Sequence, residues 1–243
     1  MNLESISSLI RTLFCLQSCL YTCHSWLKLL GAMTMAGKKK APRKSAKKDI
    51  ADQLIEAAFN RVSEYGWRRL TMFDLSKDTG FGLDEIHDVF PTKAKLLKGY
   101  VQRVDHRVFE HYEPNASDST RDKIFDLMMR RFDEFNNNKS TIKAIGREAC
   151  IDPETLCVSG CGLGCSMRKT LKTAGVRVSG VHGMMRVQAL SVIFMATFRT
   201  WLQDNSEEMS KTMADLDKRL ARAERFEQTF CRGVKRTAKK AAA

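Results

Sequence analysis

The stretch from Arg69 to Leu97, RLTMFDLSKDTGFGLDEIHDVFPTKAKLL, constrains the fold more than any other part of the chain. It has the pattern of a short helix, a glycine turn, a second short helix and a proline-marked step into a third helix. Thr71 is placed to cap the first helix, and Asp74, three residues later, completes a variant of the capping box. Gly80 stands where the chain leaves that helix and a positive φ is wanted. The pattern predicts a helix-turn-helix unit, in which the second helix can enter a DNA major groove.

The order of these residues resembles the N-terminal domain of the TetR family of bacterial regulators. The matching residues are Ala57, Ala58, Gly66, Thr71, Leu75, Gly80, Phe81, Ile86, Phe90, Pro91, Lys93, Leu96 and Leu97. The resemblance implies an all-α, TetR-like fold, with a three-helix DNA-binding domain over residues 49–112. A larger helical domain would follow, and it would bind a ligand and form a homodimer.

The resemblance also implies which residues face double-stranded DNA. They are Thr71, Gly82, Leu83, Asp84, His87, Thr92 and Lys93, in and around the expected recognition helix. Two of them depart from the family, because His87 stands where a tyrosine is usual and Gly82 replaces a serine or threonine cap. Asp84, Glu85 and Asp88 also place three carboxylates on this helix. Carboxylates repel phosphates although they can accept from cytosine, so the helix either reads bases through acids or no longer meets DNA.

The net charge of +13 is concentrated in two basic segments. Seven Lys or Arg residues and no acid lie within residues 37–48, and five more, again unopposed, lie within residues 231–243. From Asp49 to Tyr112, in contrast, nine basic residues accompany eleven acidic ones. We expect both segments to be disordered basic arms, which either neutralise DNA phosphates or serve solubility alone.

Residues 1–36 differ in character from the rest of the chain. They are apolar and cysteine-rich, and Glu4 stands where a secretory signal would carry positive charge. An apolar leader or membrane-surface helix is one interpretation, but we favour a start assigned too early, with Met33 or Met35 as the first residue. No apolar run reaches the ~20 residues of a membrane-spanning helix, so we expect a cytoplasmic protein without a stable membrane span.

The second domain, residues 119–230, has the pattern of a string of helices. Its last two, expected at about 183–202 and 207–230, have the apolar spacing of a helical bundle. The TetR resemblance implies that they form the homodimer through residues 183–228. Methionines and phenylalanines in this domain are either plain core or the lining of a pocket for a small apolar or lipid-like effector. The candidate lining residues are Phe125, Met128, Phe132, Met167, Met184, Phe194 and Phe198.

A second, looser resemblance covers patches from Arg121 to Phe226. These patches are similar to the coenzyme-Q biosynthesis lipid-binding proteins, which share the TetR-like fold. That resemblance implies an alternative function, a lipid-binding accessory protein whose helix-turn-helix no longer binds DNA.

No catalytic set stands out, since the five histidines are scattered and no hydrolase, zinc-protease or Walker motif is present. We therefore expect no enzyme and no cofactor. Three cysteines recur at every fourth position: Cys157, Cys161 and Cys165. On a helix they would line one face, where paired thiolates can share a metal. The glycines at 160, 162 and 164 make this segment a poor helix, so we expect a helix from about Leu163 to Ala174 and no metal. Asp152-Pro153, before it, marks either a loop or the start of a helix.

Overall fold

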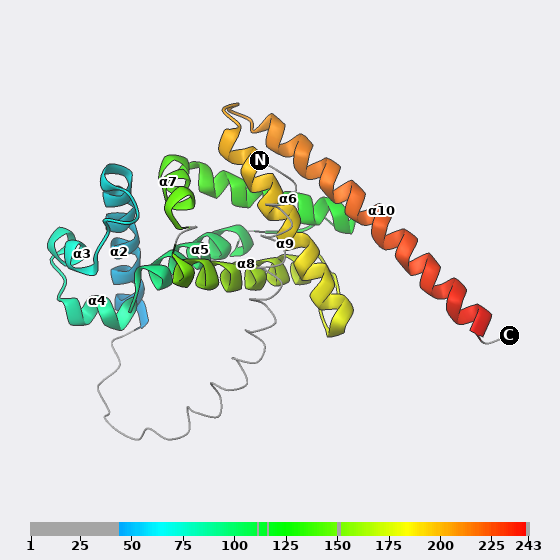
Figure 1. Cartoon of the computed structure of the whole chain (residues 1–243), viewed down its shortest axis with the longest axis horizontal. Helices are drawn as coiled ribbons and strands as arrows, with labels where there is room; N and C mark the ends of the chain where they lie inside the picture. The colour runs from blue at the N-terminus through cyan, green and yellow to red at the C-terminus, as the bar shows by residue number, and fades with distance from the viewer. Residues whose placement is uncertain (1–43, 111, 116, 150–151, 242–243) are drawn as a thin grey trace, which may run out of the picture.

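The computed structural model describes residues 44–110, 112–115, 117–149 and 152–241, and these ranges contain nine α-helices and no strand. The helices are α2 (Lys44–Tyr65), α3 (Met72–Thr79), α4 (Leu83–Val89), α5 (Lys93–Glu110), α6 (Thr120–Asn136), α7 (Lys139–Ala149), α8 (Pro153–Thr173), α9 (Gly180–Gln203) and α10 (Ser210–Ala241). The predicted all-α class is confirmed. Figure 1 shows a small head of α2, α3 and α4 at one end, and a larger helical body beside it.

The head is the predicted helix-turn-helix unit. Thr71 and Asp74 form a complete capping box, because the Thr71 hydroxyl accepts from the Asp74 amide and the Asp74 carboxylate accepts from the Thr71 amide. Gly80 ends α3 with a φ of 75°, a conformation that costs glycine nothing. The turn directs Leu75 and Ile86, both fully buried, into the hydrophobic core.

The body is built around α5, which packs against α2 of the head and against α6 and α8 of the second domain. α5 and α8 lie side by side, while α9 and α10 pack on each other at the far side (Figure 1). Aromatic rings fill the centre: Phe132 stacks on Phe194 with 5.4 Å between centroids, and the Trp201 ring lies 5.9 Å from Phe132. The Trp201 indole also donates to the side chain of Asn136 at 3.0 Å.

α8 runs unbroken through the three glycines among the cysteines. The prediction that this helix begins only at about Leu163 was wrong. Each glycine costs about 1 kcal/mol relative to alanine in a helix interior, but favourable features at both ends outweigh that cost. Asp152 caps the N-terminus just before Pro153, and Met167 and Leu171 anchor the other half in the core.

Helices α2 and α10 extend into the two segments that were predicted to be disordered basic arms. α2 begins at Lys44, inside the segment 37–48, and α10 continues to Ala241, through most of the segment 231–243. Alanine, lysine and arginine are favourable helix formers, so a helix that is anchored by packing extends readily into such segments. The predicted leader, and the part of the first arm before residue 44, lie outside the described residues.

α9 has two apolar faces. Leu190, Phe194 and Trp201 are buried on the inner face, whereas Val181 and Met185 are 67% and 53% exposed on the outer one. By length and composition alone, α9 is long and apolar enough to cross a membrane. The sequence analysis did not predict this, because the apolar residues of α9 are interrupted by polar ones. Its inner face is buried in the body of this protein, and its outer face is available for another apolar surface.

Candidate nucleic-acid interface and effector domain

Helix α4, the predicted recognition helix, presents an acidic face to solvent. The predicted DNA-facing residues of this helix and its cap are all exposed: Gly82, Leu83, Asp84 and His87. Glu85 and Asp88 are exposed as well. Glu85 replaces the missing side-chain cap in part, since its Oε2 accepts from the Gly82 amide at 3.2 Å. The sequence prediction of three surface carboxylates on this helix therefore describes the observed face.

The other three predicted DNA contacts already have partners within the protein. Thr71 is held in the capping box of α3, and the Thr92 hydroxyl donates to Glu154 Oε1 at 2.8 Å. The Lys93 ammonium lies 5.6 Å from the centroid of the Trp67 ring, in a cation–π arrangement. A contact between any of these side chains and DNA would therefore replace an internal interaction.

Arg61 of α2 neutralises the acids of α3, a role that the sequence analysis missed. Its Nη1 donates to Asp78 at 2.8 Å and its Nη2 donates to Asp74 at 2.9 Å. The hydrogen bond from the Thr71 hydroxyl, aided by the Arg61 charge, holds the pKa of Asp74 below its ordinary value. The four-residue spacing of the two aspartates, which puts them on one helix face, was the available signal.

Lys47, in the last part of the predicted N-terminal basic arm, contacts helix α4. Lys47 Nζ donates to the backbone oxygen of Asp88, near the C-terminal end of α4, at 2.7 Å. Lys48, the next residue of α2, is exposed as Lys47 is. In Figure 1 the start of α2 lies beside α4 at the lower left. Positive charge thus stands next to an acidic helix, where a helix-turn-helix protein meets the DNA backbone.

Two carboxylates of the second domain reach into the head. Glu148 Oε2, near the end of α7, accepts from the Arg68 amide at 2.7 Å, and Glu154, in the first turn of α8, accepts from Thr92. The turn fits closely around Glu148, because a Cβ at Gly66 would lie 2.8 Å from Glu148 Oε1. These bonds span 80 and 62 residues of sequence, so no local pattern could have revealed them.

The seven candidate effector residues separate into two groups. Six belong to the hydrophobic core, where they are wholly or partly buried: Phe125, Met128, Phe132, Met167, Phe194 and Phe198. Met184, in contrast, is 42% exposed on the outer face of α9. The first six lie in the core of the body, and Met184 is turned away from it.

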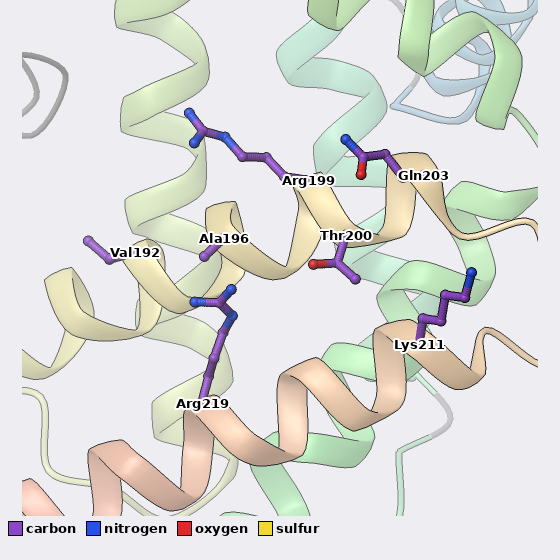
Figure 2. Close-up of a pocket in the computed structure, with 7 residues that line it drawn as sticks. All are labelled: Val192, Ala196, Arg199, Thr200, Gln203, Lys211 and Arg219. Carbon is purple, nitrogen blue, oxygen red and sulfur yellow. The ribbon is translucent and has the colours of Figure 1, made fainter. Parts of the chain in front are cut away.

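A surface groove of about 560 Å³ lies between α9 and α10 (Figure 2). Its lining residues are Val192, Ala196, Arg199, Thr200, Gln203, Lys211 and Arg219. None of the seven candidate effector residues is among them. In Figure 2 Arg219 extends from α10 toward α9, and its Nε donates to Asp215 at 2.7 Å. The groove is cationic and opens on the outer surface, so it is not the predicted apolar pocket.

The cysteine trio on α8 consists of free thiols. Burial, with smaller effects of the neighbouring Cys165 and Cys157, raises the pKa of Cys161, which therefore stays a neutral thiol at neutral pH. Across the described part of the chain, no three His, Cys, Asp or Glu side chains come together as a metal site would need.

A helix-turn-helix head, joined by one long helix to a helical body whose last two helices lie at its outer side, is the architecture of TetR-type proteins. Solved structures agree with this class. The TetR transcriptional regulator from Nitrosomonas europaea ATCC 19718 has a TM-score of 0.59 at 18% identity, over 72% of this chain and 98% of that one. A TetR regulator from Rhodococcus sp. RHA1 has a TM-score of 0.55 at 15% identity, over 74% and 96%. The predicted TetR-like fold is confirmed.

The COQ9 family model matches residues 186–227, which cover most of α9 and the first part of α10. This match agrees with the looser of the two resemblances in the sequence and covers a short part of the chain. Comparison with curated proteins gives no match.

Proposed function

We propose that this protein is a TetR-type, one-component transcriptional regulator that acts in the cytoplasm as a homodimer. A small apolar or lipid-like effector in the second domain sets its affinity for an operator. The observation that carries the proposal is the complete helix-turn-helix head, with its capped α3, its left-handed turn at Gly80 and its exposed α4.

Because the exposed face of α4 is acidic, affinity for DNA and specificity for its sequence come from different parts of the head. Affinity comes from phosphate contacts of the basic segment that leads to Lys47, because phosphate neutralisation dominates protein–DNA affinity. Specificity comes from α4, where Asp84 can accept from a cytosine amino group and His87 can reach a base edge or a phosphate. The operator should therefore contain cytosines at the positions that face α4.

The outer face of α9 supports the homodimer. Its exposed apolar side chains include Val181, Met185 and Val192, which form a stripe along one side of the helix. Single exposed apolar residues are normal on a protein surface, but a continuous stripe indicates an interaction surface. A two-fold axis beside α9 and α10 would bury this stripe against its own copy and present two heads to successive turns of DNA. The residues 183–228 predicted as the interface include most of this face.

Glu148 and Glu154 supply the physical connection between effector and head. Both carry hydrogen bonds across the domain boundary, to Arg68 and to Thr92. A movement of α7 or α8 on effector binding would therefore shift the turn before α3 and the step after α4. Such a shift changes the spacing of the two heads in the dimer, and with it the operator affinity.

The test is binding of the full chain to promoter DNA from its own and neighbouring genes, measured by fluorescence anisotropy at two salt concentrations with unrelated competitor DNA. We expect competitor-resistant binding with a log–log salt slope of about −4 to −5, as for ~5 phosphate contacts. His87→Ala and Asp84→Asn should weaken specific binding about tenfold, as loss of one base contact does. Asp84→Asn should also strengthen non-specific binding, because it removes a charge that repels phosphate.

Lys143→Ala, which removes an exposed charge from α7, is the matched control and should leave binding unchanged. Two results would refute the regulator: binding that competitor DNA abolishes, or specific binding that is insensitive to both α4 substitutions.

A second function is favoured by a separate observation, the COQ9 match over residues 186–227 together with the apolar outer face of α9. In that case the protein is a lipid-binding accessory protein and the head no longer binds DNA. Organic extraction of the purified full chain, followed by mass spectrometry, distinguishes the two. A stoichiometric isoprenoid lipid in a protein without specific DNA binding would establish the accessory protein.

A further inference from the structure

The most unusual polar group in the body is the guanidinium of Arg131 on α6. The side chain is 2% exposed, in the middle of a helical core. Its Nη2 donates to Asp105 Oδ1 on α5 at 2.5 Å, and the same oxygen accepts from the Ser166 hydroxyl on α8 at 2.7 Å. Arginine does not lose its proton in proteins, so a full positive charge is held where α5, α6 and α8 meet.

Only part of this guanidinium is satisfied. Nε and Nη1 of Arg131 are buried and have no hydrogen-bond partner within the described structure. Buried donors are almost always paired, and each orphan costs the free energy of its desolvation. The Asp105 carboxylate therefore balances the charge of Arg131 without using all of its donors, and the site retains capacity for a second acceptor.

The surroundings of Arg131 are aromatic and carry a second cation. The guanidinium carbon lies 6.0 Å from the centroid of Phe109 and 5.9 Å from that of Phe194. On Phe109 the Lys169 ammonium also lies over the ring, 4.3 Å from its centroid. Lys169 itself is exposed to solvent, so the charges held inside the body are Arg131 and Asp105, and what this site lacks is acceptors for Nε and Nη1 of Arg131.

Phe194 connects the cation to the apolar centre. It contacts Arg131 on one side and stacks on Phe132, whose ring leads to Trp201. Met128 and Met167, both fully buried, belong to the same core, and their adaptable side chains would have to be displaced to admit an inserted group, which costs free energy. A molecule with its acidic end at Arg131 would have its apolar body among these side chains.

We propose that the effector of the second domain is an anionic amphiphile, a carboxylate on an apolar body, whose head accepts hydrogen bonds from Nε and Nη1 of Arg131. This inference rests on the proposed effector-binding function and narrows it from any apolar molecule to a carboxylate. Asp105 and Ser166 are positioning residues, since they hold the guanidinium in place from two neighbouring helices. Binding would draw on groups from α5, α6, α8 and α9 together, and α8 carries Glu154 at its start.

The test compares three probes on the full chain by titration calorimetry: decanoate, which has both head and tail, decanol, which has the tail alone, and acetate, which has the head alone. We expect decanoate to saturate one site per subunit and to bind at least about tenfold more tightly than decanol, as a charge-assisted hydrogen bond allows. Acetate should bind more weakly than both.

Two variants separate recognition from folding. Arg131→Met removes the cation but leaves Asp105 buried without it, so the double variant Asp105→Asn/Arg131→Met is made beside it as a neutral pair. We expect the double variant to bind decanoate and decanol equally, with decanol affinity unchanged. Arg107→Met, which removes a half-exposed arginine of α5 that pairs with Glu134 at the surface, is the matched control and should retain the preference for decanoate.

Three results would overturn the inference: no saturable decanoate binding to the wild type, equal affinity for decanoate and decanol, or an unchanged preference in the double variant. The first two need no variant, so a folding defect cannot conceal them. If the protein does not bind promoter DNA specifically but clearly prefers decanoate, the regulator proposal is refuted and the carboxylate site is retained. If it binds promoter DNA specifically but shows no preference for decanoate, the regulator proposal is retained and its effector is a neutral molecule.

Discussion

Asp204, in the turn between α9 and α10, is the buried carboxylate whose removal should affect stability most clearly. Its side chain is fully buried, and Oδ1 accepts from the amide and hydroxyl of Ser206 at 3.1 and 2.6 Å. Oδ2 accepts from the amide and hydroxyl of Thr212, both at 2.8 Å. One side chain thus closes the turn and caps α10. The perturbation is Asp204→Asn, which keeps the shape and removes the charge.

The amide of asparagine has one acceptor atom where aspartate has two. Whichever way it is oriented, the amide nitrogen faces one backbone N–H, so that hydrogen bond is lost, whereas the neighbouring hydroxyl can rotate to accept from the amide. Hydrogen bonds to charged groups contribute about 1.5–3 kcal/mol each, so the one lost bond, together with the weakening of the other three when the charge is removed, gives a loss of about 3 kcal/mol at pH 7. For a chain of this size the melting temperature should fall by about 6–12 °C.

The pH dependence provides an independent check. Burial by itself raises the pKa of Asp204, but the hydrogen bonds from Ser206 and Thr212 outweigh it and hold the pKa far below the ordinary 3.8. Because the folded-state pKa is depressed, the stabilisation is complete above the unfolded-state value of about 4 and is lost as pH falls through the window below it. The difference between wild type and Asp204→Asn should be constant from pH 5 to 8 and should shrink below pH 4.

Guanidinium unfolding, followed by circular dichroism at several pH values, measures both quantities. Asp217→Asn is the control, because Asp217 is 57% exposed and pairs with Arg121 on the surface. Its effect should stay below about 1 kcal/mol, as for exposed ion pairs. A loss below about 1 kcal/mol for Asp204→Asn at pH 7, or a difference from wild type that is the same at pH 3 as at pH 7, would refute the reasoning, since charge-assisted bonds must exceed neutral ones.

Two further predictions concern helix interiors and caps. Gly183→Ala should destabilise the protein by about 3 kcal/mol, because the new Cβ would lie 2.1 Å from the backbone carbonyl carbon of Val178. Gly160→Ala should instead stabilise it by about 1 kcal/mol, because a Cβ there meets nothing within 4 Å and alanine is the better helix former. Thermal unfolding of both variants checks the opposite signs, and a similar shift for both would contradict the stated reason. Thr71→Ala should cost about 1 kcal/mol through loss of the α3 cap, with Thr71→Ser restoring most of it in the same assay.

The helix-turn-helix head could be predicted in detail because its signals are local. Thr71 and Asp74 are three residues apart, and the left-handed turn at Gly80 depends on one glycine, so each feature follows from a few neighbouring residues. The α8 segment shows the limit of local signals. Its glycines disfavour a helix, and the packing of Met167 and Leu171 against distant elements decided otherwise.

By itself, then, the sequence determined the elements whose causes lie within a turn or two of chain: the caps, the glycine turn, the acidic face of α4 and the apolar spacing of α9 and α10. Only the tertiary structure decided which side chains meet across the fold. It alone placed Arg131 beside Asp105 and Ser166, brought Glu148 to the head and turned Met184 away from the core. The physical reason is that capping and periodicity act between neighbours in sequence, whereas burial and ion pairing act between neighbours in space.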